Sequence, residues 1–167
     1  IIDKTHASMH WQKHKRGANH GDIAKDKGEK IPAAIIFGGE PATVFSSIAP
    51  VPEGLDKYLF AGITRKEGIK TVKCKTIDLD VPANAEIVLE GYVDPEDIRD
   101  EGPFGDHTGY YTPVEPYPTF TLTGIMRRKN PVYLTTVVGK PILEDAYIGK
   151  VIERSFLPLV QMFHPEV

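Results

Sequence analysis

The sequence has little of what would place it in several large classes of protein. It contains one cysteine, Cys74, in 167 residues, which excludes a framework of disulfide bonds and suits a reducing compartment. Its formal net charge of −3 lacks the broad basic excess of many nucleic-acid-binding proteins. No apolar run approaches the ~20 residues of a membrane-spanning helix, and no signal-peptide pattern is visible. We therefore expect a soluble cytoplasmic protein with no integral membrane segment and no nucleic-acid partner.

One segment, residues 101–111 with the sequence EGPFGDHTGYY, combines glycine, proline and acidic residues at high density. Gly and Pro fix a backbone path that an ordinary helix or strand does not take. The segment carries two carboxylates, Glu101 and Asp106, and a neighbouring negative charge raises the pKa of a carboxyl group. Two interpretations are open: a turn whose acids serve solubility and local hydrogen bonds, or a proton-transfer site on a rigidly presented loop.

The remaining residues predict strands and short helices in one domain. Residues 4–30 are polar and are expected to be loop-like. Strands are expected at 33–37, from 69 to 76, at 86–93, and at 119–126 and 132–138 as a hairpin, and helices at 42–48, 55–63 and 146–163. Pro41 opens the first of these helices, Pro158 is expected to kink the last, and Cys74 is expected to be a structural thiol on a strand. This pattern favours a mainly β fold with short helices (α+β), built as an antiparallel barrel.

The segment 101–111 resembles the signature loop of the UbiD-type decarboxylases. Further matches occur in the same order along the chain, at residues 9–12 (MHWQ), 50–52 (PVP), 58–62 (YLFAG) and 86–91 (EIVLEG). The resemblance implies a split β-barrel of the flavin-reductase-like type. It also implies an enzyme that adds or removes the carboxyl group of aromatic and α,β-unsaturated acids with prenylated FMN, with quinone biosynthesis as one candidate pathway.

The same resemblance implies roles for the two acids of the loop. Asp106 stands at the position of the family's proton donor, and Glu101 at that of a second carboxylate, which pairs with an arginine upstream. Since a proton donor has to alternate between two protonation states, we expect burial beside Glu101 to raise the pKa of Asp106. The alternative for Asp106 is a turn aspartate that caps Thr108 or Gly109.

Cofactor contacts are implied for a short segment near the start of the chain. His10, Trp11 and Gln12 match positions that contact the cofactor in relatives, and Lys15 and Arg16 match a nearby basic contact. Cations and backbone N–H groups of this kind suit a flavin phosphate. The alternatives are a solvated charged face and, for Trp11, a core side chain.

A divalent metal ion, Mn²⁺, is also implied, held by the flavin phosphate, an asparagine, a histidine and a glutamate. His10 matches the histidine. The glutamate position falls on Lys57, which cannot bind a metal ion while protonated but could neutralise a phosphate directly. Asp56 or Glu53 could substitute for it. The resemblance also allows a K⁺ site formed by backbone groups around residues 46, 47 and 49.

The family's catalytic arginine and metal-binding asparagine precede a segment like residues 1–3, so we expect this chain to be the central portion of a longer enzyme. Residues 1–145 would form the cofactor-binding domain, and 146–167 a linker helix toward a C-terminal domain. The fragment alone should be inactive, and the whole protein should form a homo-oligomer supplied by a flavin prenyltransferase. The alternatives are a carboxylase subunit acting on a phenolic substrate and a non-catalytic flavin-binding or assembly subunit. Lys57 favours the last of these slightly, and the presence of both acids argues against it.

Overall fold

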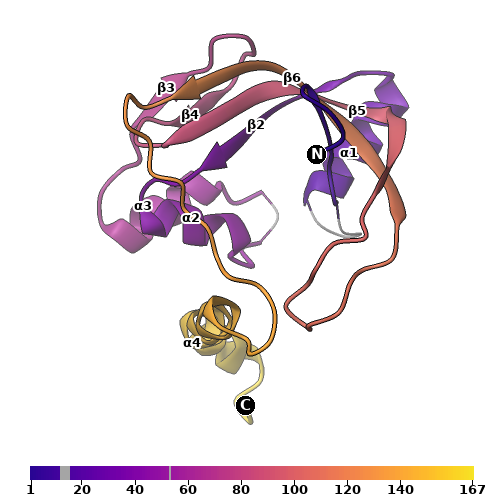
Figure 1. Cartoon of the computed structure of the whole chain (residues 1–167). Coiled ribbons are helices and arrows are strands. Elements are labelled where there is room, and N and C mark those ends of the chain that lie inside the picture. Colours follow the sequence, from indigo (N-terminus) through magenta and orange to yellow (C-terminus); the bar gives the residue numbers. More distant parts are fainter. Residues whose placement is uncertain (12–15, 53) are drawn as a thin grey trace. The chain divides into compact units, whose positions relative to one another are not determined.

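A computed structural model of the chain describes residues 1–11, 16–52 and 54–167 (Figure 1). These residues form a mixed α/β structure with antiparallel sheets and four helices. They divide into two compact units, the first containing residues 1–101 and 115–134 and the second residues 102–114 and 135–167. The predicted domain boundary after residue 145 stays a prediction.

The first unit is built on a four-stranded antiparallel sheet, in which the long strands β5 and β6 lie side by side (Figure 1). In sheet order, its strands are β1 (His6–Ser8), β6 (Glu115–Arg127), β5 (Ile87–Glu101) and β2 (Ile31–Phe37). A second sheet pairs β3 (Thr71–Lys73) with β4 (Asp80–Pro82). In the part of the chain that the structure describes, the larger sheet ends at β1 and β2 and does not close. The predicted split barrel is therefore not confirmed.

A β-bulge in β5 decides which of its side chains enter the core. Val88 and Glu90 are buried on one face, and the register then shifts between Glu90 and Gly91, so that Gly91 and Val93 are buried next. Val88 packs with Cys74 and other apolar residues in the hydrophobic cluster of this unit. Because of this shift, two consecutive residues of β5, Glu90 and Gly91, are both buried.

Glu90 is a fully buried carboxylate that fastens the loop after β3. Its oxygens accept hydrogen bonds from the Lys75 N–H at 2.9 and 3.0 Å, the Thr76 N–H at 2.6 Å and the Thr76 hydroxyl at 2.8 Å. Burial raises the pKa of Glu90, but these hydrogen bonds lower it by more, and the pKa lies below its ordinary value of 4.5. The loop therefore depends on an ionised carboxylate.

Replacing Glu90 with Gln is expected to destabilise the protein by about 2 kcal/mol at neutral pH, because an amide cannot accept all of these hydrogen bonds. The pKa of Glu90 is lowered on folding, so its contribution is present above the ordinary value of 4.5 and is lost as the pH falls through the folded value. Urea denaturation of both proteins between about pH 7 and pH 3 measures this. A difference in unfolding free energy that does not shrink with falling pH would contradict it.

The predicted helices between β2 and β3 are confirmed with small shifts, as α2 (Pro41–Ile48) and α3 (Lys57–Arg65). Pro41 stands at the start of α2, where the Glu40 carboxylate accepts a hydrogen bond from the Thr43 N–H at 3.0 Å. The Asp56 carboxylate caps α3 through the Tyr58 N–H at 2.6 Å. These caps fix the residues at which the two helices begin.

The prediction that residues 4–30 are loop-like is wrong. They contain β1 and the helix α1 (Arg16–Lys27), which buries only Gly21 and Ala24. Because its buried side is made of small residues, α1 lacks the stripe of large apolar residues by which a helix is usually recognised. Its packing against the sheet is a tertiary effect.

Two further predictions of strands are corrected. The strand predicted at 119–126 is confirmed as part of β6, but its predicted hairpin partner is wrong: residues 132–138 form no strand, and β6 pairs with β5 and β1. Strand β3 stops at Lys73 because the next backbone N–H groups bond elsewhere: that of Cys74 donates to the Leu79 carbonyl at 2.9 Å, and that of Lys75 donates to the Glu90 carboxylate. Cys74 therefore follows the strand. It is buried, and burial raises the pKa of its thiol, as expected of a structural cysteine.

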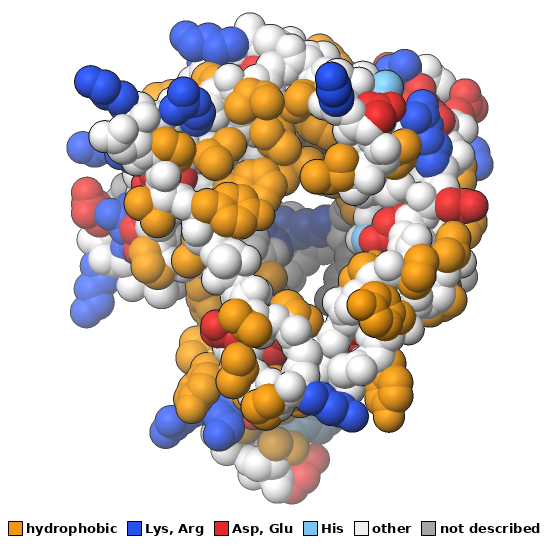
Figure 2. All heavy atoms as spheres, viewed as in Figure 1, with side chains coloured by type: hydrophobic (Ala, Val, Ile, Leu, Met, Phe, Trp, Pro, Cys, Tyr) orange, Lys and Arg blue, Asp and Glu red, His pale blue; other side chains and the backbone are white. Residues whose placement is uncertain are grey.

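The second unit contains the predicted C-terminal helix, α4 (Glu144–Phe163), with Pro158 inside it. All of α4 is described, and none of its residues is buried. Apolar side chains cover much of the face of the molecule in Figure 2, and those of α4 are among the exposed ones, with Met162 and Phe163 at 73% and 80% exposure. Within the described ranges, no helix combines the length and the apolar character needed to cross a bilayer.

Candidate active site

The register of β1 on β6 places His10 beside Tyr117. His6 pairs with Thr121 and Ser8 with Thr119, and the Met9 N–H continues the pairing with a hydrogen bond of 2.8 Å to the carbonyl of residue 118. One step further, His10 lies across from Tyr117, and the two rings stack with centroids 4.4 Å apart and planes inclined by 27°.

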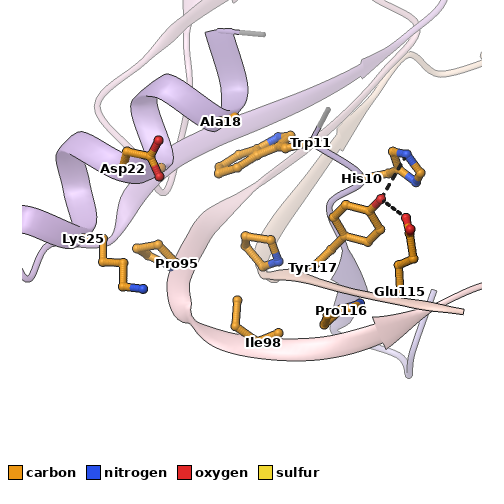
Figure 3. Close-up of a pocket in the computed structure, with 12 residues that line it drawn as sticks. His10, Trp11, Ala18, Asp22, Lys25, Pro95, Ile98, Glu115, Pro116 and Tyr117 are labelled. Atoms are coloured by element: carbon orange, nitrogen blue, oxygen red, sulfur yellow. Dashed lines mark hydrogen bonds between the residues drawn. The ribbon is translucent and has the colours of Figure 1, made fainter. Parts of the chain in front are cut away.

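The pairing of β5 with β6 adds two carboxylates to the same place. Glu101, the last residue of β5, pairs with Glu115, the first residue of β6. Since alternate residues of a strand share a face, Glu115 and Tyr117 lie on one side of the sheet. The Nδ1 atom of His10 lies 2.9 Å from Glu101 Oε2. Its Nε2 atom lies 3.3 Å from the Tyr117 hydroxyl, which donates to Glu115 Oε2 at 2.6 Å (Figure 3). We call these four residues the His10 network.

The His10 network keeps Tyr117 protonated. Its hydrogen bond to Glu115, together with burial and the negative charges of Glu115 and Glu101, raises the pKa of Tyr117 to about 12. A neutral phenol retains the O–H group that it donates to Glu115. The network therefore joins two acids through one hydroxyl and one imidazole ring.

Three members of the His10 network, His10, Glu115 and Tyr117, line a cavity of about 710 Å³ between α1 and the strands β5 and β6 (Figure 3). Trp11 lies in its wall, packed on α1: a Cβ atom added to Gly17 or Gly21 would come within 2.7 or 2.9 Å of the indole. The two glycines thus leave room for the ring. Trp11 is half-buried, so it packs on the helix and lines the cavity at the same time.

Arg16, the other described residue predicted to bind the cofactor, is not among the residues that line this cavity. Arg16 donates through Nη2 to the carbonyl oxygens of Pro52 at 2.7 Å and Leu55 at 2.9 Å, which fastens the segment before α3. Gln12 and Lys15 lie outside the described residues. Their role as cofactor contacts, like that of Arg16, stays a prediction.

Asp106 lies in the second unit, at the tip of a narrow hairpin. The hairpin is closed by a bridge between Gly105 and Tyr111. At its tip, the Asp106 N–H donates to the Tyr110 carbonyl at 3.1 Å, and the Gly109 N–H donates to the Asp106 carbonyl at 3.0 Å. Gly109 has φ of +84°, a conformation that favours glycine. The loop is therefore a defined turn, which both interpretations of the sequence require.

The expected rise in the pKa of Asp106 is not what the structure shows. Burial raises it, but the backbone N–H and ring of His107 and the hydroxyl of Thr108 bond to the carboxylate, and the net pKa lies below the ordinary value. His107 Nδ1 lies 3.0 Å from one carboxylate oxygen, and the Thr108 hydroxyl donates to the other at 3.3 Å. These local donors, which sequence spacing does not reveal, outweigh burial.

The described residues do not by themselves assemble a site for a divalent metal ion, and the predicted Mn²⁺ stays a prediction. The structure brings together no group of three or more His, Cys, Asp or Glu side chains, among those that it describes, that could hold one. Asp56 caps α3, and Lys57, the first residue of α3, donates to the Ser47 carbonyl in the last turn of α2. A cation there satisfies a helix C-terminus. Glu53 lies outside the described residues.

Lys57 also bears on the predicted K⁺ site. The Ser47 carbonyl, one of the backbone groups expected around that ion, accepts a hydrogen bond from the Lys57 ammonium group. The Ser46 hydroxyl donates to the Ala42 carbonyl at 2.6 Å. Both groups are engaged within the protein, and the potassium site stays a prediction.

A flavin fits the described residues better than a metal ion does. The cavity has the size of an ordinary ligand site, roughly 300–1,000 Å³. Trp11 and Tyr117 offer aromatic faces on which a flat ring can stack, and Lys25 adds a cation to the lining. The lining also contains the carboxylates of Asp22 and Glu115, so its aromatic faces, and not its charge, suit a flavin ring.

Sequence reasoning missed Tyr117 and Glu115. Their signal is the alternation in the segment EPYPTFT, which puts residues 115 and 117 on one face of a strand. To place Tyr117 and Glu115 in a site, the strands that pair with this segment must also be known. The predicted hairpin assigned it the wrong partner.

Comparison with known proteins gives curated relatives over the whole chain. A protein of Archaeoglobus fulgidus is 54% identical over 168 residues, covering 100% of this chain and 35% of the relative. A protein of Aquifex aeolicus is 52% identical over 168 residues with the same coverage. Both carry the name "Uncharacterized protein". The chain thus spans about a third of the length of these relatives.

Solved structures are similar at lower identity. The UbiD-class enzyme HmfF from Pelotomaculum thermopropionicum, in complex with FMN, superposes with a TM-score of 0.85 at 29% identity, covering 96% of this chain and 36% of HmfF. An evolved dimeric form of HmfF, in complex with prFMN, gives 0.86, also at 29% identity, covering 96% of this chain and 37% of that one. The vanillic acid decarboxylase of Sedimentibacter hydroxybenzoicus, in closed form, gives 0.84 at 28% identity, covering 89% of this chain and 32% of that one.

A match to a family model establishes the family of this chain. The UbiD model, described as the 3-octaprenyl-4-hydroxybenzoate carboxy-lyase Rift-related domain, matches residues 1–141. That range contains the His10 network and the hairpin that carries Asp106. The chain belongs to the UbiD family of carboxy-lyases.

Proposed function

We propose that this chain carries the cofactor-binding and proton-transfer part of an enzyme that reversibly decarboxylates an aromatic or α,β-unsaturated carboxylic acid with prenylated FMN. One observation carries the proposal: Glu101, a predicted catalytic acid, is held by His10, and the His10 side chain itself lines a cavity with aromatic walls. The chain belongs to a family in which the similar enzyme HmfF forms complexes with FMN and prFMN.

The roles of the residues follow from what decarboxylation requires. Prenylated FMN supplies the electron sink that loss of CO₂ from an aromatic or unsaturated carbon needs. Trp11 and Tyr117 would hold its rings. Asp106 would give a proton to the carbon that loses CO₂, and Glu101 would be the second carboxylate. Because His107 and Thr108 favour the ionised form of Asp106, these contacts have to change when Asp106 is protonated.

Several finer parts of the proposal concern the whole protein. It would receive prenylated FMN from a flavin prenyltransferase, act as a homo-oligomer, and take a small aromatic acid as substrate, with quinone biosynthesis as one setting. The same residues serve the reverse reaction, carboxylation of a phenolic substrate, because a proton transfer can run in both directions. No step is assigned to a divalent metal ion, since the described residues do not form a site for one.

A second candidate function is favoured by Lys57. This residue stands at the position predicted for a metal-binding glutamate, and its ammonium group bonds to the Ser47 carbonyl. A non-catalytic subunit that binds flavin through the same fold could accept this change. The hydrogen bond between His10 and Glu101 argues for the enzyme, because a non-catalytic subunit does not require a positioned acid.

The test of the proposed function uses the complete gene product that contains residues 1–167, co-expressed with a flavin prenyltransferase. We expect the purified protein to show the visible absorbance of a bound flavin and to release a compound with the mass of prenylated FMN. Protein expressed without the prenyltransferase is the control, and should lack that mass. Absence of flavin at every level of prenyltransferase would exclude the enzymatic function.

A further inference from the structure

We propose that Tyr117 and Glu115 are positioning residues for the catalytic acid Glu101, and that they act through His10. The inference deepens the proposed function and rests on it. Its evidence is the unbroken series of contacts in the His10 network: Glu115 to Tyr117 at 2.6 Å, Tyr117 to His10 at 3.3 Å, and His10 to Glu101 at 2.9 Å.

The register of the sheet explains why Glu101 needs such support. Glu101 and Glu115 are direct partners at the end of the β5–β6 ladder, and like charges directly opposite each other are unfavourable. The Tyr117 hydroxyl and the His10 ring provide a hydrogen-bonding partner for each carboxylate. Without them, repulsion from Glu115 would turn the Glu101 side chain away from its present position.

The orientation of the His10 ring is fixed from two sides. Stacking on Tyr117 sets the plane of the ring, and the contacts of Nδ1 with Glu101 and of Nε2 with Tyr117 set its rotation within that plane. Removal of the Tyr117 hydroxyl takes away the contact at Nε2, so that the His10 ring can rotate about the bond between Cβ and the ring. Nδ1 would then no longer point at Glu101.

This geometry gives His10 a role other than metal binding. An imidazole binds a metal ion through the lone pair of one ring nitrogen. In this structure, both ring nitrogens lie within hydrogen-bond distance of protein groups, Glu101 on one side and Tyr117 on the other. A metal ion at His10 would have to displace one of the two.

The structural part of the test does not depend on activity. Crystal structures of the complete protein and of its Tyr117→Phe variant would be compared. We expect the distance between His10 Nδ1 and Glu101 Oε2 to increase beyond about 3.5 Å in the variant, which ends the hydrogen bond. If His10 and Glu101 keep their positions, the inference is overturned, whether or not the protein decarboxylates any acid.

The kinetic part of the test is a double-mutant cycle on the prenylated-FMN-loaded protein. Tyr117→Phe should lower kcat roughly 10- to 100-fold with KM and flavin content unchanged, since a misplaced group slows the chemical step. In a His10→Gln background, the same change should have less than about a 2-fold effect, because the hydroxyl of Tyr117 acts only through His10. Tyr147→Phe, at an exposed position on α4, is the matched control and should leave kcat unchanged.

The remaining outcomes separate the two proposals. Equal losses of kcat from Tyr117→Phe in both backgrounds would overturn the inference and leave the proposed function in place. A matching loss of flavin content and kcat would also overturn it, since that result indicates a structural role. If the loaded protein decarboxylates no acid, the proposed function fails, and the crystal structures alone decide whether Tyr117 positions Glu101.

Discussion

Replacing Asp106 with Asn is expected to reduce decarboxylation roughly 10²- to 10⁴-fold, the usual contribution of a general acid. Asparagine has the size of aspartate, so the turn closed by the backbone of Asp106, Gly109 and Tyr110 should be retained. Its amide cannot deliver a proton to carbon as a carboxylic acid does. Release of CO₂ and exchange of substrate hydrogen with solvent deuterium, measured on the prenylated-FMN-loaded protein, should therefore both be lost while bound flavin is retained.

The control for this prediction is Asp26→Asn, which removes the same charge from an exposed position near the end of α1. It should leave both rates unchanged. If the Asp106→Asn variant retained more than a tenth of the activity, another group would have to be the proton donor. Loss of bound flavin in that variant would instead show that Asp106 holds the cofactor.

Replacing Gly91 with Ala is expected to destabilise the protein by about 3 kcal/mol, because the added methyl group has no room in the core. A Cβ atom at Gly91 would overlap the Thr121 carbonyl oxygen and come within 2.7 Å of the Phe120 ring. Phe120 is almost fully buried, and the Thr121 carbonyl belongs to the β6 backbone, so neither can move without separating β5 from β6. Urea denaturation should show a lower midpoint.

Gly149→Ala is the matched control for Gly91→Ala. Gly149 lies inside α4 and has no atom within 4 Å of an added Cβ, so alanine there should be neutral or slightly stabilising, by up to ~1 kcal/mol. A Gly91→Ala variant as stable as the wild type would show that β5 and β6 do not approach each other this closely at the bulge.

The parts of the fold that could be predicted from the sequence are those fixed by local chemistry. Pro41 and the acidic caps Glu40 and Asp56 mark the starts of α2 and α3, and the apolar run at residues 33–37 marks β2. The β-branched residues at 132–138 were misleading. They have the composition of a strand, but no neighbouring strand pairs with them.

The candidate site could be predicted only in part, because it is assembled by strand pairing between distant segments of the chain. Family resemblance pointed to His10, Trp11 and Glu101, but only the register of β1 and β5 on β6 brings His10 and Glu101 together. That register joins residues about 100 positions apart in the sequence and includes the shift at Gly91. Alternation within one strand cannot reveal which residues of another strand it faces.

The shortness of β1 has a consequence for heat resistance. Among the described residues, the strand has three residues, lies at the edge of the sheet, and pairs only with β6. Segments of this kind detach at a lower free-energy cost than the whole fold unfolds. Since His10 follows β1 directly, such detachment would withdraw it from Glu101 while β5 and β6 stay paired. On warming, the proposed activity would therefore be lost before the fold unfolds.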